Sequence, residues 1–191
     1  MQAMQTVQGE AQGQAILAGR AVGAMFFFAF GGLWLTGWAL NSHRGKAWIV
    51  PIIVAAAVLF GVARRRYQRH APALALEKDS PERRRAGRIF NIVNSAQWIV
   101  IVGLGLVLRN TGHGAWIIPM AIGIVGLHFF PLAAVFKNPP HYVTGAAMVA
   151  LALLYPLLAG PASPIGFLGA GIILWLSAAW ALRPGRIAAA S

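Results

Sequence analysis

Long apolar stretches that lack acidic and basic residues are the feature that most constrains this chain. A helix needs about 20 such residues to cross the hydrocarbon of a bilayer. Stretches near that length, bounded by charge, proline or glycine, predict membrane-spanning helices over residues 21–40, 47–63, 89–108, 115–136, 141–158 and 165–182. The sequence therefore predicts an all-α integral membrane protein, a bundle of six transmembrane helices.

Composition supports this class and indicates a single unit. Hydrophobic residues make up 58% of the chain and charged residues only 10%, whereas a soluble domain keeps about a quarter of its residues charged. The absence of cysteine excludes disulfides and thiolate chemistry. We expect one membrane domain over residues 1–191, with a cytoplasmic tail over 1–14 and a basic cytoplasmic loop over 64–88.

The distribution of lysine and arginine predicts the orientation, because basic loops are retained on the cytoplasmic side. If the N-terminus is cytoplasmic, only Arg44, Lys46 and Arg109 of the 16 basic residues fall on the outer side. Both termini are then cytoplasmic, which agrees with an even number of spans. We expect a multi-pass protein of the cell (inner) membrane.

The net charge of +12 is explained by this topology, so we expect no nucleic-acid partner. Basic side chains near the bilayer surface attract anionic lipid headgroups, each by on the order of 1 kcal/mol. The expected headgroup contacts are Arg64, Arg65, Arg66, Arg83, Arg84 and Arg85.

An internal repeat relates the first four predicted helices. Ala18-Gly19-Arg20 matches Ala86-Gly87-Arg88 at an offset of 68 residues, and Ala47-Trp48-Ile49-Val50-Pro51 matches Ala115-Trp116-Ile117-Ile118-Pro119 at the same offset. Each unit contains two spans, so the two-helix hairpins share one orientation and form a parallel repeat.

Polar residues at depth are the candidates for function, because each is costly in hydrocarbon and needs a partner. All four acidic residues lie outside the predicted spans. That placement argues against a proton carrier built on an intramembrane carboxylate and against a carboxylate-ligated metal site, and we expect no catalytic residue, metal or cofactor. A bis-histidine haem is disfavoured because His128 is the only histidine in the interior of a predicted span.

The remaining deep polar residues lie in the second hairpin and form the candidate ligand-binding set Asn91, Asn94, Gln97 and His128. Helical spacing places Asn91 and Asn94 on one face with Ser95 and Trp98, and Gln97 beside it. Counted from Arg88 and Lys137 at about 1.5 Å per residue, Gln97 and His128 each lie roughly 13 Å inside the cytoplasmic edge. On antiparallel neighbours they could meet.

Two functions fit these residues. One is a binding or transport module for a small solute or a lipid, with a polar pocket between the third and fourth helices; it predicts a continuous cavity that reaches His128. The other is a structural or regulatory membrane subunit without its own ligand, whose amides join helices; it predicts an enclosed His128 bonded to Asn94 or Gln97. An enzyme that uses His128 as a base is disfavoured, because no nucleophile or acid is paired with it at that depth.

Overall fold

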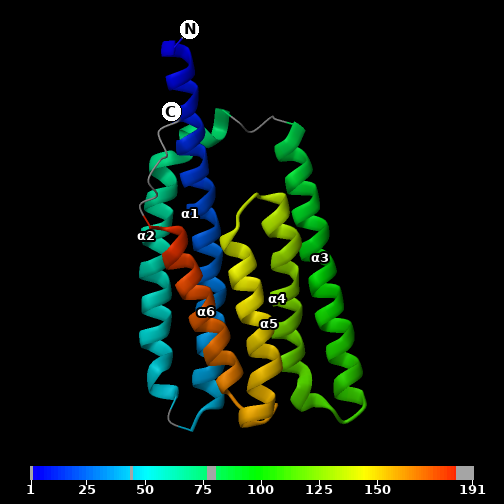
Figure 1. Cartoon of the computed structure of the whole chain (residues 1–191). Coiled ribbons are helices and arrows are strands. Elements are labelled where there is room, and N and C mark those ends of the chain that lie inside the picture. Colours follow the sequence, from blue (N-terminus) through cyan, green and yellow to red (C-terminus); the bar gives the residue numbers. More distant parts are fainter. Residues whose placement is uncertain (1, 44, 77–80, 184–191) are drawn as a thin grey trace.

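The computed structural model describes residues 2–43, 45–76 and 81–183, and every regular element in these ranges is helical. Figure 1 shows α1 (Gln2–Asn41), α2 (Ile49–Leu76), α3 (Pro81–Asn110), α4 (Ile117–Val135), α5 (Pro140–Ala159) and α6 (Ile165–Ala181), with 3-10 turns η1 (Lys46–Trp48) and η2 (Gly114–Trp116) before α2 and α4. In the described residues, 5 helices are long and apolar enough to cross a membrane, and α6 is a shorter apolar helix of 17 residues. The helices confirm the all-α fold. Their length and hydropathy support the multi-pass membrane class.

Three helices are longer than the predicted spans. The predicted tail over residues 1–14 belongs almost wholly to α1, and α2 and α3 extend through most of the predicted loop over residues 64–88. Arginine, glutamine, alanine and leucine dominate these extensions and are strong helix formers. Hydropathy therefore marks where a helix becomes polar, whereas the helix itself continues beyond that point.

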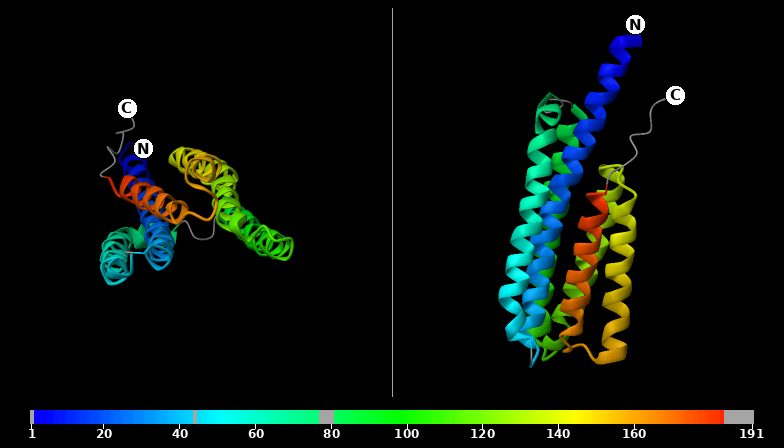
Figure 2. Two further views of the ribbon diagram at one scale, coloured as in Figure 1. Left: turned by 90° about the horizontal axis from the view of Figure 1, so that it is seen from below. Right: turned by 90° about the vertical axis from the view of Figure 1, so that its left-hand side faces the viewer.

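The helices pack as a row in the order α2, α1, α6, α5, α4, α3. Figure 2 shows two halves, one of α1, α2 and α6 and the other of α3, α4 and α5. Within the described residues, α3 packs only against α4 and the adjoining η2. We call the end that carries the start of α1, the end of α2 and the start of α3 the basic end, and the end with η1 and η2 the turn end (Figure 1).

Aromatic side chains join the two halves toward the basic end. Phe27 of α1 meets Phe129 of α4 edge to face, with ring centroids 5.4 Å apart. Both belong to a buried cluster with Phe28 of α1, Ala63 of α2 and Leu174 of α6. Edge-to-face rings add about 0.5–1.5 kcal/mol to the burial of their surface, so this contact supplements the packing of α5 on α6 that joins the halves.

Close glycine crossings hold two of the helix pairs. A Cβ added at Gly126 of α4 would lie 3.0 Å from the carbonyl oxygen of Gly145 in α5, and one added at Gly145 would lie 2.8 Å from that of Gly126. A Cβ at Gly171 of α6 would lie 2.9 Å from the oxygen of Gly31 in α1. Small residues permit this approach, which is a principal source of helix association in lipid.

The two hairpins share a turn but differ in packing. Each second helix follows a 3-10 turn, and the turns at Lys46–Trp48 and Gly114–Trp116 keep the offset found in the sequence. Ala15, Ala18, Ala21 and Ala24 are buried along α1, whereas α3 is exposed along most of its length. The internal repeat itself stays a prediction.

The crossing of α4 and α5 can be tested with matched alanine substitutions. We expect Gly126→Ala to lower the free energy of unfolding by about 1–3 kcal/mol, because the new methyl overpacks a backbone contact. Gly103→Ala in α3, where an added Cβ meets nothing within 4 Å, should raise it by up to about 1 kcal/mol through helix propensity. Thermal unfolding in detergent measures both. Equal effects at the two positions would contradict the crossing.

Candidate functional site

The candidate site lies where α3 meets α4. The less exposed positions of α3 recur every three or four residues and mark the seam that faces α4. They are Ala86, Ile89, Phe90, Val93, Asn94, Gln97, Ile101, Gly105 and Leu108. Phe90 meets Phe136 with ring centroids 6.1 Å apart, and a Cβ at Gly105 would lie 4.0 Å from the terminal methyl of Met120. The helices thus run antiparallel and bring Gln97 to the level of His128.

Gln97 has the most unusual environment in this seam. Among the described side chains of α3 it is the only buried one, at 9% exposure. Its Oε1 atom is fully covered and has no hydrogen-bond partner in the described residues. An amide oxygen that loses water and gains no donor costs about 1–3 kcal/mol. Such an atom requires an explanation, either as a cost of packing or as an acceptor for a ligand.

His128 of α4 bonds within its own helix. Its Nδ1 donates to the carbonyl oxygen of Val125 over 2.6 Å, which leaves the Nε2 atom as an acceptor. Among the residues that the structure describes, His128 makes no hydrogen bond with Asn94 or Gln97. The direct amide–imidazole pairing expected of a purely structural seam is therefore not made in this structure.

The two asparagines face different ways. Asn94 is half-buried in the seam, whereas Asn91, Ser95 and Trp98 are exposed on the outward side of α3. The predicted single face of Asn91, Asn94, Ser95 and Trp98 is therefore wrong in its orientation. The packed face of α3 is centred on Gln97 and includes only Asn94 of these four residues. Asn94 and Gln97 lie at the seam and Asn91 lies outside it, whereas His128 is half-buried on α4 at the level of Gln97.

His141 of α5 shares the neighbour Phe129 with His128, although the sequence does not place it among the candidate residues. The centroid of Phe129 lies 4.4 Å from that of His128 and 5.8 Å from that of His141. The side-chain nitrogen of Asn138 lies 3.2 Å from Nε2 of His141. The turn at Asn138 and Pro139 joins α4 to α5. His128 and His141 stand on either side of this turn in the sequence, and that placement could have indicated that the two side chains lie near each other. In the described residues, no three His, Asp or Glu side chains gather as metal ligands.

Some of the basic residues are exposed at the surface, and one forms a hydrogen bond within the protein. Arg64 and Arg65 of α2 and Arg84 and Arg85 of α3 are exposed. Arg66 is half-buried and donates from its guanidinium to the carbonyl oxygen of Leu182, just after α6. A cation at a helix C-terminus is favourable because it meets unpaired carbonyls. The side chain of Arg83 lies outside the described residues.

The chain matches no protein-family model, no curated protein and no solved structure. The geometry of the seam is therefore what bears on its function.

Replacing Gln97 tests whether its amide oxygen is unpaired. We expect Gln97→Met to raise the free energy of unfolding by about 1–3 kcal/mol, because an apolar chain of similar length removes an unsatisfied acceptor. Asn91→Met, on the exposed face, should change it by no more than about 0.5 kcal/mol. Thermal unfolding of both variants in detergent provides the comparison. A less stable Gln97→Met would show that the amide already has a partner.

Proposed function

We propose that this protein is a membrane-embedded binding module for a small solute or a lipid headgroup, with its site on the seam between α3 and α4. The observation that supports this function is the buried, unpartnered Oε1 of Gln97. A ligand O–H or N–H at that position would supply the missing donor. It would convert an unfavourable buried atom into part of a recognition site.

The chemistry of the seam favours a ligand that carries hydrogen-bond donors. Oε1 of Gln97 accepts, Nε2 of His128 accepts in the tautomer that donates to Val125, and the amide of Asn94 both donates and accepts. A hydroxyl-bearing or amine-bearing group fits this set. Both glycerol-based headgroups and small polyols belong to that class.

The packing of α3 gives such a ligand a route. Because α3 is attached only through α4 in the described residues, the seam borders the bilayer on both sides. Arg64 and Arg65 are exposed in the second half of α2 and Arg85 in the first turns of α3, where they would concentrate anionic headgroups. Transport across the bilayer would require a second state that exposes the seam on the other side, so binding is the part of the function that the geometry supports.

The proposed topology has six spans, with α6 as the sixth and the basic end in the cytoplasm. A chain without cysteine suits single-cysteine labelling. In intact cells, we expect an impermeant maleimide to label Thr111→Cys at the turn end, and to label Gln68→Cys and Arg183→Cys only after permeabilisation. All three positions are exposed. Labelling of Arg183→Cys from outside would show that α6 does not cross.

A structural or regulatory subunit is the second candidate. The outward face of α3, with Asn91, Ser95 and Trp98 exposed, is the observation that favours it. Polar side chains on a spanning helix commonly bond across to a neighbouring helix. In that case Asn91→Ala would weaken association with a partner and leave ligand binding at Gln97 unchanged.

Ligand-linked stability tests the binding function. The probes are dihexanoyl phosphatidylglycerol, dihexanoyl phosphatidylethanolamine and glycerol 3-phosphate. We expect at least one to raise the thermal midpoint of the wild type and of Asn91→Ala, with a stabilisation of about 2.7 kcal/mol at a hundredfold excess over Kd. Gln97→Met and His128→Phe should lose this response. Equal shifts in all variants, or none in any, would contradict a site at the seam.

A further inference from the structure

A cavity lies between the two halves at the turn end, far from the seam at Gln97. Its volume is about 320 Å³, near the lower limit for small-molecule sites. Both halves and the turn that joins them contribute to its walls. The lining residues are Asn41, Gly114, Ala115, Ile117, Ile118, Pro161, Ala162, Ser163 and Phe167.

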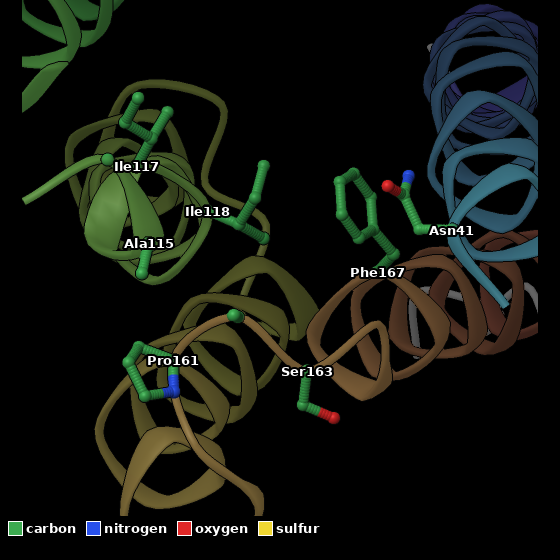
Figure 3. A pocket seen from close by; sticks show the side chains of 9 residues that line it. Asn41, Ala115, Ile117, Ile118, Pro161, Ser163 and Phe167 are labelled. Atoms are coloured by element: carbon green, nitrogen blue, oxygen red, sulfur yellow. The ribbon is translucent and has the colours of Figure 1, made fainter.

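The lining is neutral and mixes polar with apolar surface. None of the lining residues carries a charge, so a charged ligand would lose its hydration without a counter-charge. Figure 3 shows Phe167 of α6 and Ile118 of α4 on opposite sides of the space, with the amide of Asn41 beside Phe167. The ring of Phe167 also contacts Trp34, with centroids 5.6 Å apart, which fixes one wall.

Asn41 provides the polar group for recognition. Its Nδ2 donates to the carbonyl oxygen of Gly37 over 2.8 Å, which leaves the Oδ1 atom as an acceptor, on the side toward Phe167 (Figure 3). The hydroxyl of Ser163 accepts a hydrogen bond from the backbone nitrogen of Ile165, the first residue of α6. A ligand that donates one hydrogen bond is therefore matched by Asn41.

We propose that the cavity between α1, α4 and the α5–α6 turn is a second binding site, for a neutral small molecule that carries one hydroxyl. This site goes beyond the proposed function, since it shares no residue with the seam. A molecule bound there would fill the space between the halves at the end where the aromatic bridge of Phe27 and Phe129 does not hold them.

Cysteine protection with simple aromatic probes tests the charge preference. The probes are benzyl alcohol, benzoate and benzylammonium, which share a ring and differ in charge. Ala115→Cys lies on the cavity wall, and Asn110→Cys is an exposed control outside it. When free benzyl alcohol exceeds its Kd about tenfold, labelling of Ala115→Cys by N-ethylmaleimide should slow by roughly tenfold, because protection follows occupancy. Labelling of Asn110→Cys should not change.

The charged probes should protect neither position. Equal protection by benzoate or benzylammonium, protection of Asn110→Cys, or no protection by benzyl alcohol would each overturn the proposal. Gln97→Met in the same background should leave the protection intact, so failure at this cavity is distinguishable from failure at the seam.

The role of Asn41 is tested with Asn41→Leu and a probe that lacks the hydroxyl. Benzyl alcohol should bind Asn41→Leu about five- to tenfold more weakly, which corresponds to one hydrogen bond, whereas toluene should bind the variant and the wild type alike. Saturation-transfer NMR in detergent measures both affinities. An equal loss for the two probes would show that the variant altered the cavity rather than the recognition, and would overturn the role of Asn41.

Discussion

Backbone approach at glycine is the constraint on which the arrangement of helices depends. Lipid chains are as apolar as leucine, so burial of apolar surface does little to draw helices together in a membrane, and close packing has to do so. Gly126 against Gly145 and Gly31 against Gly171 provide contacts in which an added Cβ would lie about 3 Å or less from a carbonyl oxygen. These crossings fix α4 on α5 and α1 on α6, which are two of the five neighbouring pairs in the row.

The third helix has no such crossing, and its glycines show why it stands apart. An added Cβ at Gly103 meets no neighbour, and one at Gly105 only reaches a methionine methyl. Side chains alone therefore hold α3 on α4. In this looser contact the Oε1 atom of Gln97 is covered and meets no donor among the described residues, while the Nδ1 atom of His128 bonds within α4. The absence of a close crossing and the unpaired amide oxygen of Gln97 are thus both properties of the loose contact between α3 and α4.

The sequence predicts the apolar helices well and their neighbours poorly. Charge-free runs identify each α-helix of the described residues, because a helix satisfies the backbone hydrogen bonds of an apolar run within the run itself. The same runs do not reveal that α2 continues to Leu76. Arginine and alanine favour the helix as strongly as leucine does, so the helix extends past the apolar run. Helical spacing grouped Asn91 with Asn94, but the choice of packed face depends on which helix meets α3. The sequence places His141 only at the edge of a span, because its ring neighbours Phe27 and Phe129 come from α1 and α4.

Isotope-edited infrared spectroscopy of Gln97 is the most direct test of the central claim, that its buried amide oxygen is unpaired and available to a ligand. The measurement is the difference spectrum between ¹³C-glutamine-labelled wild type and labelled Gln97→Met. We expect a side-chain carbonyl band at the high frequency of an oxygen without a hydrogen bond, and a shift to lower frequency when a stabilising probe is added. A band already at the hydrogen-bonded position, unmoved by every probe, would contradict the claim.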